Sequence, residues 1–291
     1  MTDSAYHKNA VKPFVILSSQ RSGSTFVRIW LNHHSEIHSY GEVFLRHYES
    51  ADGFKAYCAR DFASRWLFRI GHSRLVRGLR LGIFPKSLVG AYLNELLYGE
   101  NYPAPWTDVG NKVNDTQARK KKSVIGLKLM YNTIRQYPAL EKWIFEQNPN
   151  VIHLTRENLL RKYVSMVRLN ITRVAHIKAE SSMKKKVNID VKNFIEFADS
   201  HTATVAMYRD RLLQVSPYLE LSYEEFFADT GAAKDNILDF LELGNQEMPF
   251  PEMKKIGSND LSDDIENWDE VCNALVDTNY EKFLDARELP H

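Results

Sequence analysis

The sequence predicts a single α/β domain with a central, mostly parallel sheet, because short buried strands alternate with helices along the chain. The first strand is followed at once by a loop of small residues and a helix, an order that opens many nucleotide-binding domains. The 291 residues, 44% hydrophobic and 26% charged, suffice for one such domain. No internal repeat or linker divides the chain, so we assign residues 1–291 to one domain.

The first half of the chain supplies two strands and a long helical segment. Residues 14–17 form a short apolar run that predicts a buried strand, and residues 26–31 are expected to form a helix. Residues 54–98 are aromatic-rich and helical in pattern, whereas residues 101–122 contain prolines and a lysine run and are expected to form a loop. A second buried strand is predicted over residues 123–130.

The second half repeats the alternation of helix and strand, with strands expected at residues 151–154 and 219–223. We treat residues from about 46 to 120 as a variable helical insertion that flanks the sheet. Helices are expected at residues 138–147, 157–175, 191–214 and 231–243.

Composition excludes several classes of protein. The formal net charge is +1, so the chain carries no basic surplus for nucleic acid. Cys58 and Cys272 lie far apart, which excludes a disulfide scaffold and a cysteine-based zinc site. Residues 1–12 are polar, and no apolar run is long enough for a signal peptide or a membrane span. We therefore expect a cytoplasmic protein.

The loop at residues 18–25 shares part of the phosphate-binding pattern G-x-x-x-x-G-K-[ST]. Gly23 and Thr25 match the pattern, Ser24 stands where the lysine would be, and the basic residue has moved to Arg21. A glycine turn, inward N–H groups and a helix N-terminus can hold an anion, which Arg21 can bind through two hydrogen bonds. The domain is therefore expected to be P-loop-like. The alternative is a serine-rich turn that only caps the helix.

The segment Gln20-Arg21-Ser22-Gly23-Ser24-Thr25 resembles the loop P-[RK]-[ST]-G-[ST]-T of sulfotransferases that use 3′-phosphoadenosine 5′-phosphosulfate (PAPS), with Gln20 in place of proline. The match is close to the bacterial carbohydrate-sulfotransferase branch, which includes nodulation-factor and trehalose sulfotransferases. The resemblance implies an enzyme that moves the sulfuryl group of PAPS to a carbohydrate or glycolipid hydroxyl and leaves 3′,5′-ADP. It assigns the 5′-phosphosulfate to Ser19, Gln20, Arg21, Ser22, Gly23, Ser24 and Thr25.

A second anion site is expected where Arg156 ends a strand and Ser165 lies in the following helix. Ligands of open α/β sheets bind at the carboxyl ends of strands, so the two side chains can converge on one anion. The stretch H-L-T-R-E-N-L-L-R-K-Y-V-S resembles the same family, which implies that Arg156 and Ser165 bind the 3′-phosphate. The alternatives are a surface salt bridge for Arg156 and a backbone hydrogen bond for Ser165.

The resemblance continues downstream. The segment at residues 221–227 resembles the family's Y-E-E-L strand end, which implies that Tyr223 lies near the nucleotide. Lys254, Lys255 and residues 265–271 resemble the tail of the same branch. The resemblance covers most of the chain except residues from about 46 to 120.

A general base must remove the proton of the acceptor hydroxyl, because the donor loop supplies only Arg21, as a catalytic cation, and backbone N–H groups. Animal-type members place a histidine two residues after a strand lysine, but here Lys128 is followed by Met130, which takes no proton. The bacterial branch places a glutamate in a loop after the first helix, here residues 38–44, which implies that Glu42 is the base. The alternative is an exposed loop carboxylate.

Lys128 is unusual inside an apolar strand, because lysine is rarely buried without a partner. Burial at an anion site would resolve the conflict, with Lys128 stabilising the bridging oxygen or the sulfuryl group during catalysis. The alternative is an edge strand with Lys128 facing water.

Two further features of the sequence carry less weight. His33, His34, Glu36 and His38 lack the spacing of metal ligands, and the resembling family needs no metal, so none is expected. Six arginines recur at nearly helical spacing, which favours a solvated helix face over contact with a membrane or an anionic glycolipid. They are Arg60, Arg65, Arg69, Arg74, Arg77 and Arg80.

Two other functions compete with sulfuryl transfer. A P-loop kinase would need the missing lysine after Gly23 and a magnesium-binding aspartate at a strand end. A non-catalytic nucleotide-binding module would need the loop but no base. The sequence names neither the acceptor, a glycan or other small molecule, nor the oligomeric state.

Overall fold

The computed structural model describes residues 11–73, 83–99, 122–172, 186–214, 217–251, 258 and 260–284. Five strands form one sheet in the order β2-β3-β1-β4-β5, and every neighbouring pair is parallel. The predicted α/β fold with a mostly parallel sheet is therefore confirmed. In chain order the strands are β1 (Lys12–Ser18), β2 (Ile37–Tyr40), β3 (Val124–Met130), β4 (Asn150–Thr155) and β5 (Tyr218–Ser222).

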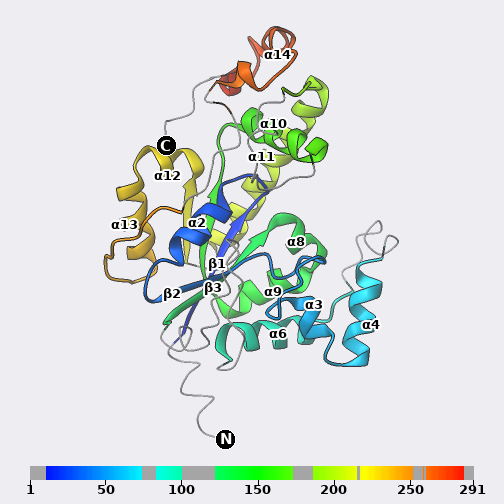
Figure 1. Ribbon diagram of the computed structural model, residues 1–291, viewed down its shortest axis with the longest axis vertical. Helices are drawn as coiled ribbons and strands as arrows, with labels where there is room; N and C mark the ends of the chain where they lie inside the picture. The colour runs from blue at the N-terminus through cyan, green and yellow to red at the C-terminus, as the bar shows by residue number, and fades with distance from the viewer. Residues whose placement is uncertain are drawn as a thin grey trace, which may run out of the picture.

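Helices cover both faces of this sheet (Figure 1). Successive residues of β1 point to opposite faces, so Val15 and Leu17 enter one hydrophobic cluster while Phe14 and Ile16 enter another. The face with Ile16 packs against α2 (Ser24–Leu31), α12 (Tyr223–Ala228) and α13 (Thr230–Phe240). The face with Leu17 packs against α6 (Lys86–Tyr98), α8 (Tyr131–Gln136) and α9 (Pro138–Gln147).

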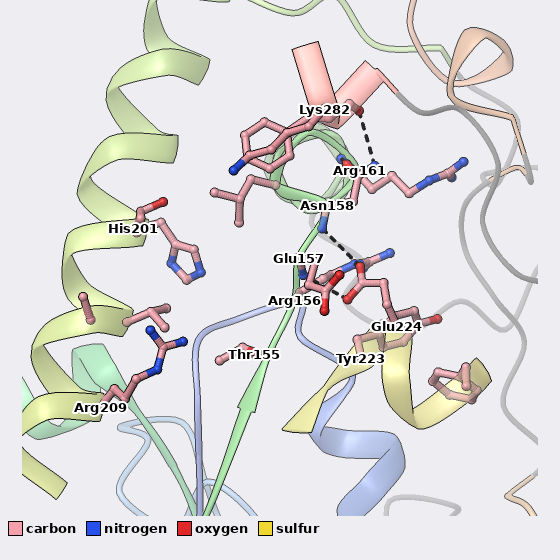
Figure 2. Close-up of a pocket in the computed structure, with 16 residues that line it drawn as sticks. Thr155, Arg156, Glu157, Asn158, Arg161, His201, Arg209, Tyr223, Glu224 and Lys282 are labelled. Atoms are coloured by element: carbon pink, nitrogen blue, oxygen red, sulfur yellow. Dashed lines mark hydrogen bonds and ion pairs between the residues drawn. The ribbon is translucent and has the colours of Figure 1, made fainter. Parts of the chain in front are cut away.

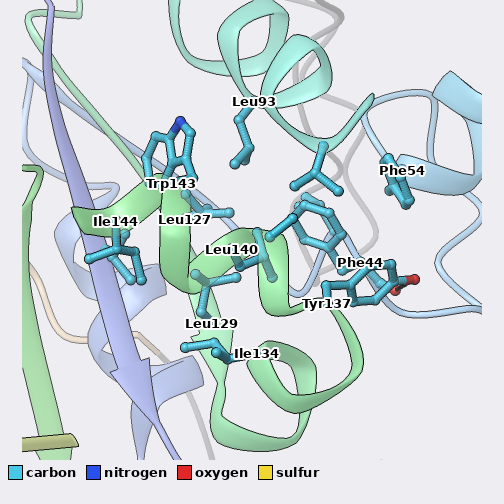
Figure 3. Close-up of a cluster of buried hydrophobic side chains, with 14 of the residues drawn as sticks. Phe44, Phe54, Leu93, Leu127, Leu129, Ile134, Tyr137, Leu140, Trp143 and Ile144 are labelled. Carbon is cyan, nitrogen blue, oxygen red and sulfur yellow. Dashed lines mark hydrogen bonds between the residues drawn. The ribbon is translucent and has the colours of Figure 1, made fainter. Parts of the chain in front are cut away.

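Aromatic rings dominate the cluster on the face with Leu17 (Figure 3). The ring of Phe44 lies 5.0 Å from those of both Phe54 and Tyr137, centroid to centroid, and none of the three is more than 3% exposed. Each large aromatic side chain removes about 150–250 Å² of surface from water, so this packing is a major source of stability. It also anchors the chain just after β2, where Glu42 lies.

A third cluster packs beyond the carboxyl ends of the strands. It contains buried residues of the long helices α10 (Leu159–Thr172) and α11 (Val191–Leu213) and of the C-terminal elements. An ion pair of 2.7 Å joins Arg168 of α10 to Asp264, and both side chains are almost fully buried. The C-terminal elements are η2 (Leu261–Asp263), α14 (Trp268–Leu275) and η3 (Glu281–Leu284).

The structure differs from the prediction over residues 38–44, which were expected to form a loop. Residues 37–40 form strand β2, and the loop begins only at Gly41. This polar segment is a strand because it pairs in parallel with residues 124–127 of β3, and the side-chain amide of Asn32 hydrogen-bonds both backbone groups of Ser39. The helix predicted at residues 138–147 is found with the same bounds.

Some expectations fall wholly or mostly outside the described residues. These are the loop at residues 101–122, the tail lysines Lys254 and Lys255, and Arg74, Arg77 and Arg80 of the arginine-rich segment. The helical insertion at about residues 46–120 stays a prediction. Within it, the structure describes α3 (Phe54–Cys58), α4 (Phe62–Gly71) and α6.

Helix α4 presents Arg65 and Arg69 to solvent, as a solvated helix face requires. Two large apolar side chains are also exposed there, Phe62 at 83% and Trp66 at 56%. Among the helices that the structure describes, none is long and apolar enough to pass through a bilayer.

Candidate functional site

The loop between β1 and α2 has an unusual backbone at two positions. Gly23 caps α2 with φ of 75°, and Arg21 has φ of 62°, so both lie in the left-handed region. A Cβ atom on Gly23 would lie 2.6 Å from Cδ2 of Tyr223, which no side chain tolerates. Glycine is therefore required at this position both for its φ angle and for the close approach of Tyr223.

Two serines of this loop contact each other, and one of them also accepts a hydrogen bond from helix α10. The hydroxyls of Ser19 and Ser22 lie 2.9 Å apart, and Lys162 of α10 donates to the Ser19 hydroxyl. Lys162 is only 1% exposed, and its Nζ lies 2.8 Å from Nε2 of His201 on α11. Burial, with a smaller contribution from Arg156, lowers the pKa of Lys162 to about 7.

Arg21 connects the loop to the second predicted anion site. Its Nε donates to the hydroxyl of Ser165 over 2.7 Å, and Arg156 donates from Nη1 to the backbone carbonyl of Arg21 over 3.2 Å. The predicted loop residue and the two predicted 3′-phosphate residues therefore lie side by side. Their roles in binding stay predictions.

The positive charges around Arg21 affect its ionisation. Burial lowers the pKa of the Arg21 guanidinium, and the nearby charges of Arg156 and Arg168 lower it further. Like charges at close range in a partly desolvated place are unfavourable until an anion neutralises them. The arrangement is consistent with the predicted anion site, whose binding role stays a prediction.

Tyr223 and Glu224 fix Arg156 from the α12 side. The guanidinium carbon of Arg156 lies 4.4 Å from the centre of the Tyr223 ring, a cation–π distance. The carboxylate of Glu224 lies 3.9 Å from Nε of Arg156 and accepts hydrogen bonds from the backbone N–H groups of Glu157 and Asn158. The short segment between β4 and α10 is thereby tied to α12.

A pocket of about 590 Å³ opens beside these residues (Figure 2). In the figure, β4 rises between α11 and α12, and Arg156 and Tyr223 lie on the α12 side. His201 and Arg209 of α11 and Lys282 of η3 form other parts of the wall. The pocket is therefore continuous with the second anion site and has more basic than acidic side chains on its wall.

Lys128 lies on the other side of the loop. It pairs in register with Ile16, so it points toward the face that α2 covers. Its Nζ donates to the Thr25 hydroxyl over 2.8 Å and to Oε1 of Glu42 over 2.9 Å. The alternative of a water-facing edge lysine is wrong, because β3 lies between β1 and β2 and Lys128 is 4% exposed.

Glu42 lies two residues after the end of β2, and its side chain is 23% exposed. Its Oε1 forms an ion pair with Nζ of Lys128. The carboxylate is therefore reachable from solvent while Lys128 fixes its position. The alternative of a merely exposed loop carboxylate does not account for this pairing.

The remaining predicted residues fall into two groups. Ser22 and Ser24 are buried in the loop, whereas Gln20 is exposed at its tip.

The residues that the sequence analysis did not assign to the site are Lys162 and His201. The available signal for Lys162 was its position three residues before Ser165, which places both side chains on one helix face.

The histidine cluster near the end of α2 has structural contacts. Nε2 of His34 lies 3.1 Å from the carbonyl oxygen of Gly244, and Nδ1 of His34 accepts from the backbone N–H of Glu36. Nδ1 of His33 lies 3.3 Å from the carbonyl oxygen of Trp30. Within the described ranges, no three histidine, cysteine or carboxylate side chains are grouped to hold a metal ion.

Comparison with protein families gives one match over most of the chain. The model described as the sulfotransferase family matches residues 13–247, which include the loop, Glu42, Lys128, Arg156 and Ser165. No curated protein sequence matches this chain significantly.

Two solved structures are similar to this chain at low sequence identity. One is a sulfotransferase domain from the Synechococcus PCC 7002 olefin synthase, 20% identical, with 82% of this chain and 76% of that chain covered and a TM-score of 0.40. The other is a sulfotransferase domain from the curacin biosynthetic pathway, 16% identical, with 97% and 92% covered and a TM-score of 0.44.

Proposed function

Because the chain belongs to the sulfotransferase family, we propose that it transfers the sulfuryl group of PAPS to a hydroxyl of a carbohydrate or glycolipid. The observation that supports this most is the meeting of Arg21, Arg156 and Ser165. One phosphate loop serves any nucleotide, but two adjoining anion sites suit a donor with charged groups at both its 5′ and 3′ positions.

The donor-binding roles follow from the placement of these groups. The backbone N–H groups at the start of α2 and the guanidinium of Arg21 bind the 5′-phosphosulfate. Arg156 and Ser165 bind the 3′-phosphate, and Tyr223 lies against the loop near the nucleotide. Binding of this polyanion relieves the repulsion among the clustered arginines.

The transfer step needs a base and a cation on the acceptor side of the loop. Glu42 accepts the proton of the attacking hydroxyl, and Lys128 stabilises negative charge on the transferring group and the bridging oxygen. Lys128 contacts both the Glu42 carboxylate and the Thr25 hydroxyl at the start of α2, where the sulfuryl end of the donor is expected. The oxygen–sulfur bond to the acceptor forms as the bond to the nucleotide phosphate breaks.

The acceptor class rests on the resemblance of the Glu42 loop to carbohydrate sulfotransferases. A glycolipid is included because Phe62 and Trp66 are exposed on α4, which a solvated basic face formed by Arg65 and Arg69 does not by itself explain. Aromatic and basic side chains together are typical of surfaces that lie at a lipid headgroup layer.

The test is sulfuryl transfer by the purified protein. The protein is incubated with PAPS and a panel of hydroxyl-bearing carbohydrates and glycolipids in the presence of EDTA, and release of 3′,5′-ADP is followed by chromatography. We expect acceptor-dependent release with a matching gain of about 80 Da in the acceptor, the mass of SO₃, because an SO₃H group replaces the hydroxyl hydrogen.

The two rival functions predict different results, and the kinase is tested in a parallel incubation with ATP and magnesium in place of PAPS and EDTA. Turnover of ATP that requires magnesium, without use of PAPS, would identify a P-loop kinase. Binding of 3′,5′-ADP without transfer to any acceptor would leave a nucleotide-binding module.

A further inference from the structure

Lys162 is the most deeply buried lysine that the structure describes, and the roles above do not include it. It is 1% exposed, yet it contacts the phosphate loop directly through the Ser19 hydroxyl. Ser19 in turn contacts Ser22 inside the loop. A change in the charge of Lys162 therefore alters its hydrogen bond to Ser19 and, through the Ser19 hydroxyl, the contact with Ser22 in the loop.

We infer that Lys162 is a positioning residue for the donor, which holds the phosphate loop through Ser19 and takes up a proton when the donor nucleotide binds. The inference rests on the proposed function, because it needs a highly charged anion in the loop. The proton comes from solvent, and His201, which contacts Lys162, lies on the wall of the open pocket (Figure 2).

The contact between Lys162 and His201 can persist in either charge state of the lysine. Burial, and after it the charges of Lys162 and His153, lower the pKa of His201 to about 3, so its ring is neutral near pH 7. A charged Lys162 donates to the lone pair on Nε2 of His201. A neutral Lys162 accepts from Nε2 after a tautomer change, so loss of the proton leaves no buried group unpaired.

The charged groups around Lys162 determine the direction of the effect. Burial is the largest cause of its lowered pKa, and Arg156 adds to it while Glu224 opposes it. A nucleotide held by Arg156 and the loop brings several negative charges to the same place, which raises the pKa of Lys162. The groups that face Lys162 from other elements are Ser19, Arg156, Phe197, His201 and Glu224.

The sign of the pH dependence follows from this shift. In the free protein Lys162 has lost much of its charge above pH 7, whereas with nucleotide bound it stays protonated to a higher pH. Binding therefore takes up a proton between the two pKa values. The dissociation constant rises by up to about tenfold for each pH unit in that interval, since one pKa unit corresponds to a factor of ten.

The test is calorimetric titration of the full chain with 3′,5′-ADP from pH 6.5 to 9, in buffer pairs with different ionisation enthalpies. The wild type is expected to take up a large fraction of a proton near pH 8. At pH 6.5, Lys162→Met should bind 3′,5′-ADP more weakly than the wild type does, and at pH 8 it should take up no proton. As pH rises, the affinity of the wild type should fall toward that of Lys162→Met. Lys162→Arg keeps its charge throughout, so its affinity should not depend on pH between 7 and 9.

Two further variants serve as controls. His201→Gln retains a group that can donate and accept, and proton uptake should persist because His201 itself does not titrate in this range. Lys192→Met removes an exposed lysine of α11 and should behave as the wild type. The first shows that the proton is taken up by Lys162 rather than by His201, and the second separates a specific role of Lys162 from a general loss of positive charge.

The outcomes distinguish this inference from the proposed function. If the wild type binds 3′,5′-ADP but takes up no more proton than Lys162→Met, the inference is overturned and the proposed function stands. No binding at any pH overturns both. If Lys162→Met fails to fold, Lys162→Arg supplies the comparison, and absence of proton uptake by the wild type at pH 8 overturns the inference.

Discussion

At the scale of single residues, the proposed transfer step depends most on Lys128 and Glu42. Glu42→Gln keeps the size of the side chain and an oxygen for Lys128, but it removes the proton acceptor. We expect the turnover number to fall by about 10²–10⁴, the usual contribution of a general base, while the dissociation constant of 3′,5′-ADP changes little. The measurements are single-turnover transfer and nucleotide titration, with the exposed Glu49→Gln as control. Undiminished transfer by Glu42→Gln would remove Glu42 from the mechanism.

Gly23 gives a second prediction at this scale. Gly23→Ala places a methyl group 2.6 Å from the Tyr223 ring in a left-handed backbone, so we expect loss of most nucleotide binding. Gly90→Ala is the matched control, because nothing lies within 4 Å of a Cβ there and the position is inside helix α6. It should raise the free energy of unfolding by about 0.5–1 kcal/mol. Urea denaturation and titration with 3′,5′-ADP check both variants.

At the scale of elements, helix α10 carries both Lys162 and Ser165, and its other end is held by Arg168 and Asp264. Asp264→Ala leaves Arg168 buried without this carboxylate, which costs about 3–5 kcal/mol of stability in comparable buried pairs. Glu49→Ala breaks the exposed pair with Lys55 and should cost at most about 1 kcal/mol. Equal losses in urea denaturation would show that the buried pair does not hold α10.

Sequence patterns predicted the elements with strong apolar periodicity and missed those stabilised by individual contacts. Strand β1 and helix α9 follow from apolar runs and a proline at a helix start. Strand β2 was missed because His38 and Ser39 break the apolar pattern, and the strand is held by its pairing with β3 and by the side chain of Asn32. Side-chain contacts across the fold are not visible in local sequence.

In the candidate site, too, the residues within sequence motifs were predicted, and a residue buried only by packing was missed. Arg21, Arg156 and Ser165 follow from motifs, and the parallel sheet brings such strand ends together. Lys162 was not assigned, because a lysine on a helix is usually exposed and only the packing of α10 against α11 buries it. The burial of Lys128, by contrast, follows from its place in an apolar strand.

At the scale of the whole molecule, strand order sets the arrangement of the proposed chemistry. β1 lies between β3 and β4, so the loop after β1 has Lys128 and Glu42 on one side and Arg156 on the other. In the proposed function, the loop would hold the transferring group between an acceptor side and a nucleotide side. The choice of PAPS as the donor depends on two anion sites side by side, rather than on one phosphate loop.

The most direct test compares nucleotides with and without a 3′-phosphate on wild type and Arg156→Ala. The wild type is expected to bind 3′,5′-ADP about 10- to 100-fold more tightly than 5′-AMP, as hydrogen bonds between charged groups contribute about 1.5–3 kcal/mol. Arg156→Ala should lose most of this preference and keep its affinity for 5′-AMP. Equal binding of the two nucleotides by the wild type would contradict the second anion site and, with it, PAPS as the donor.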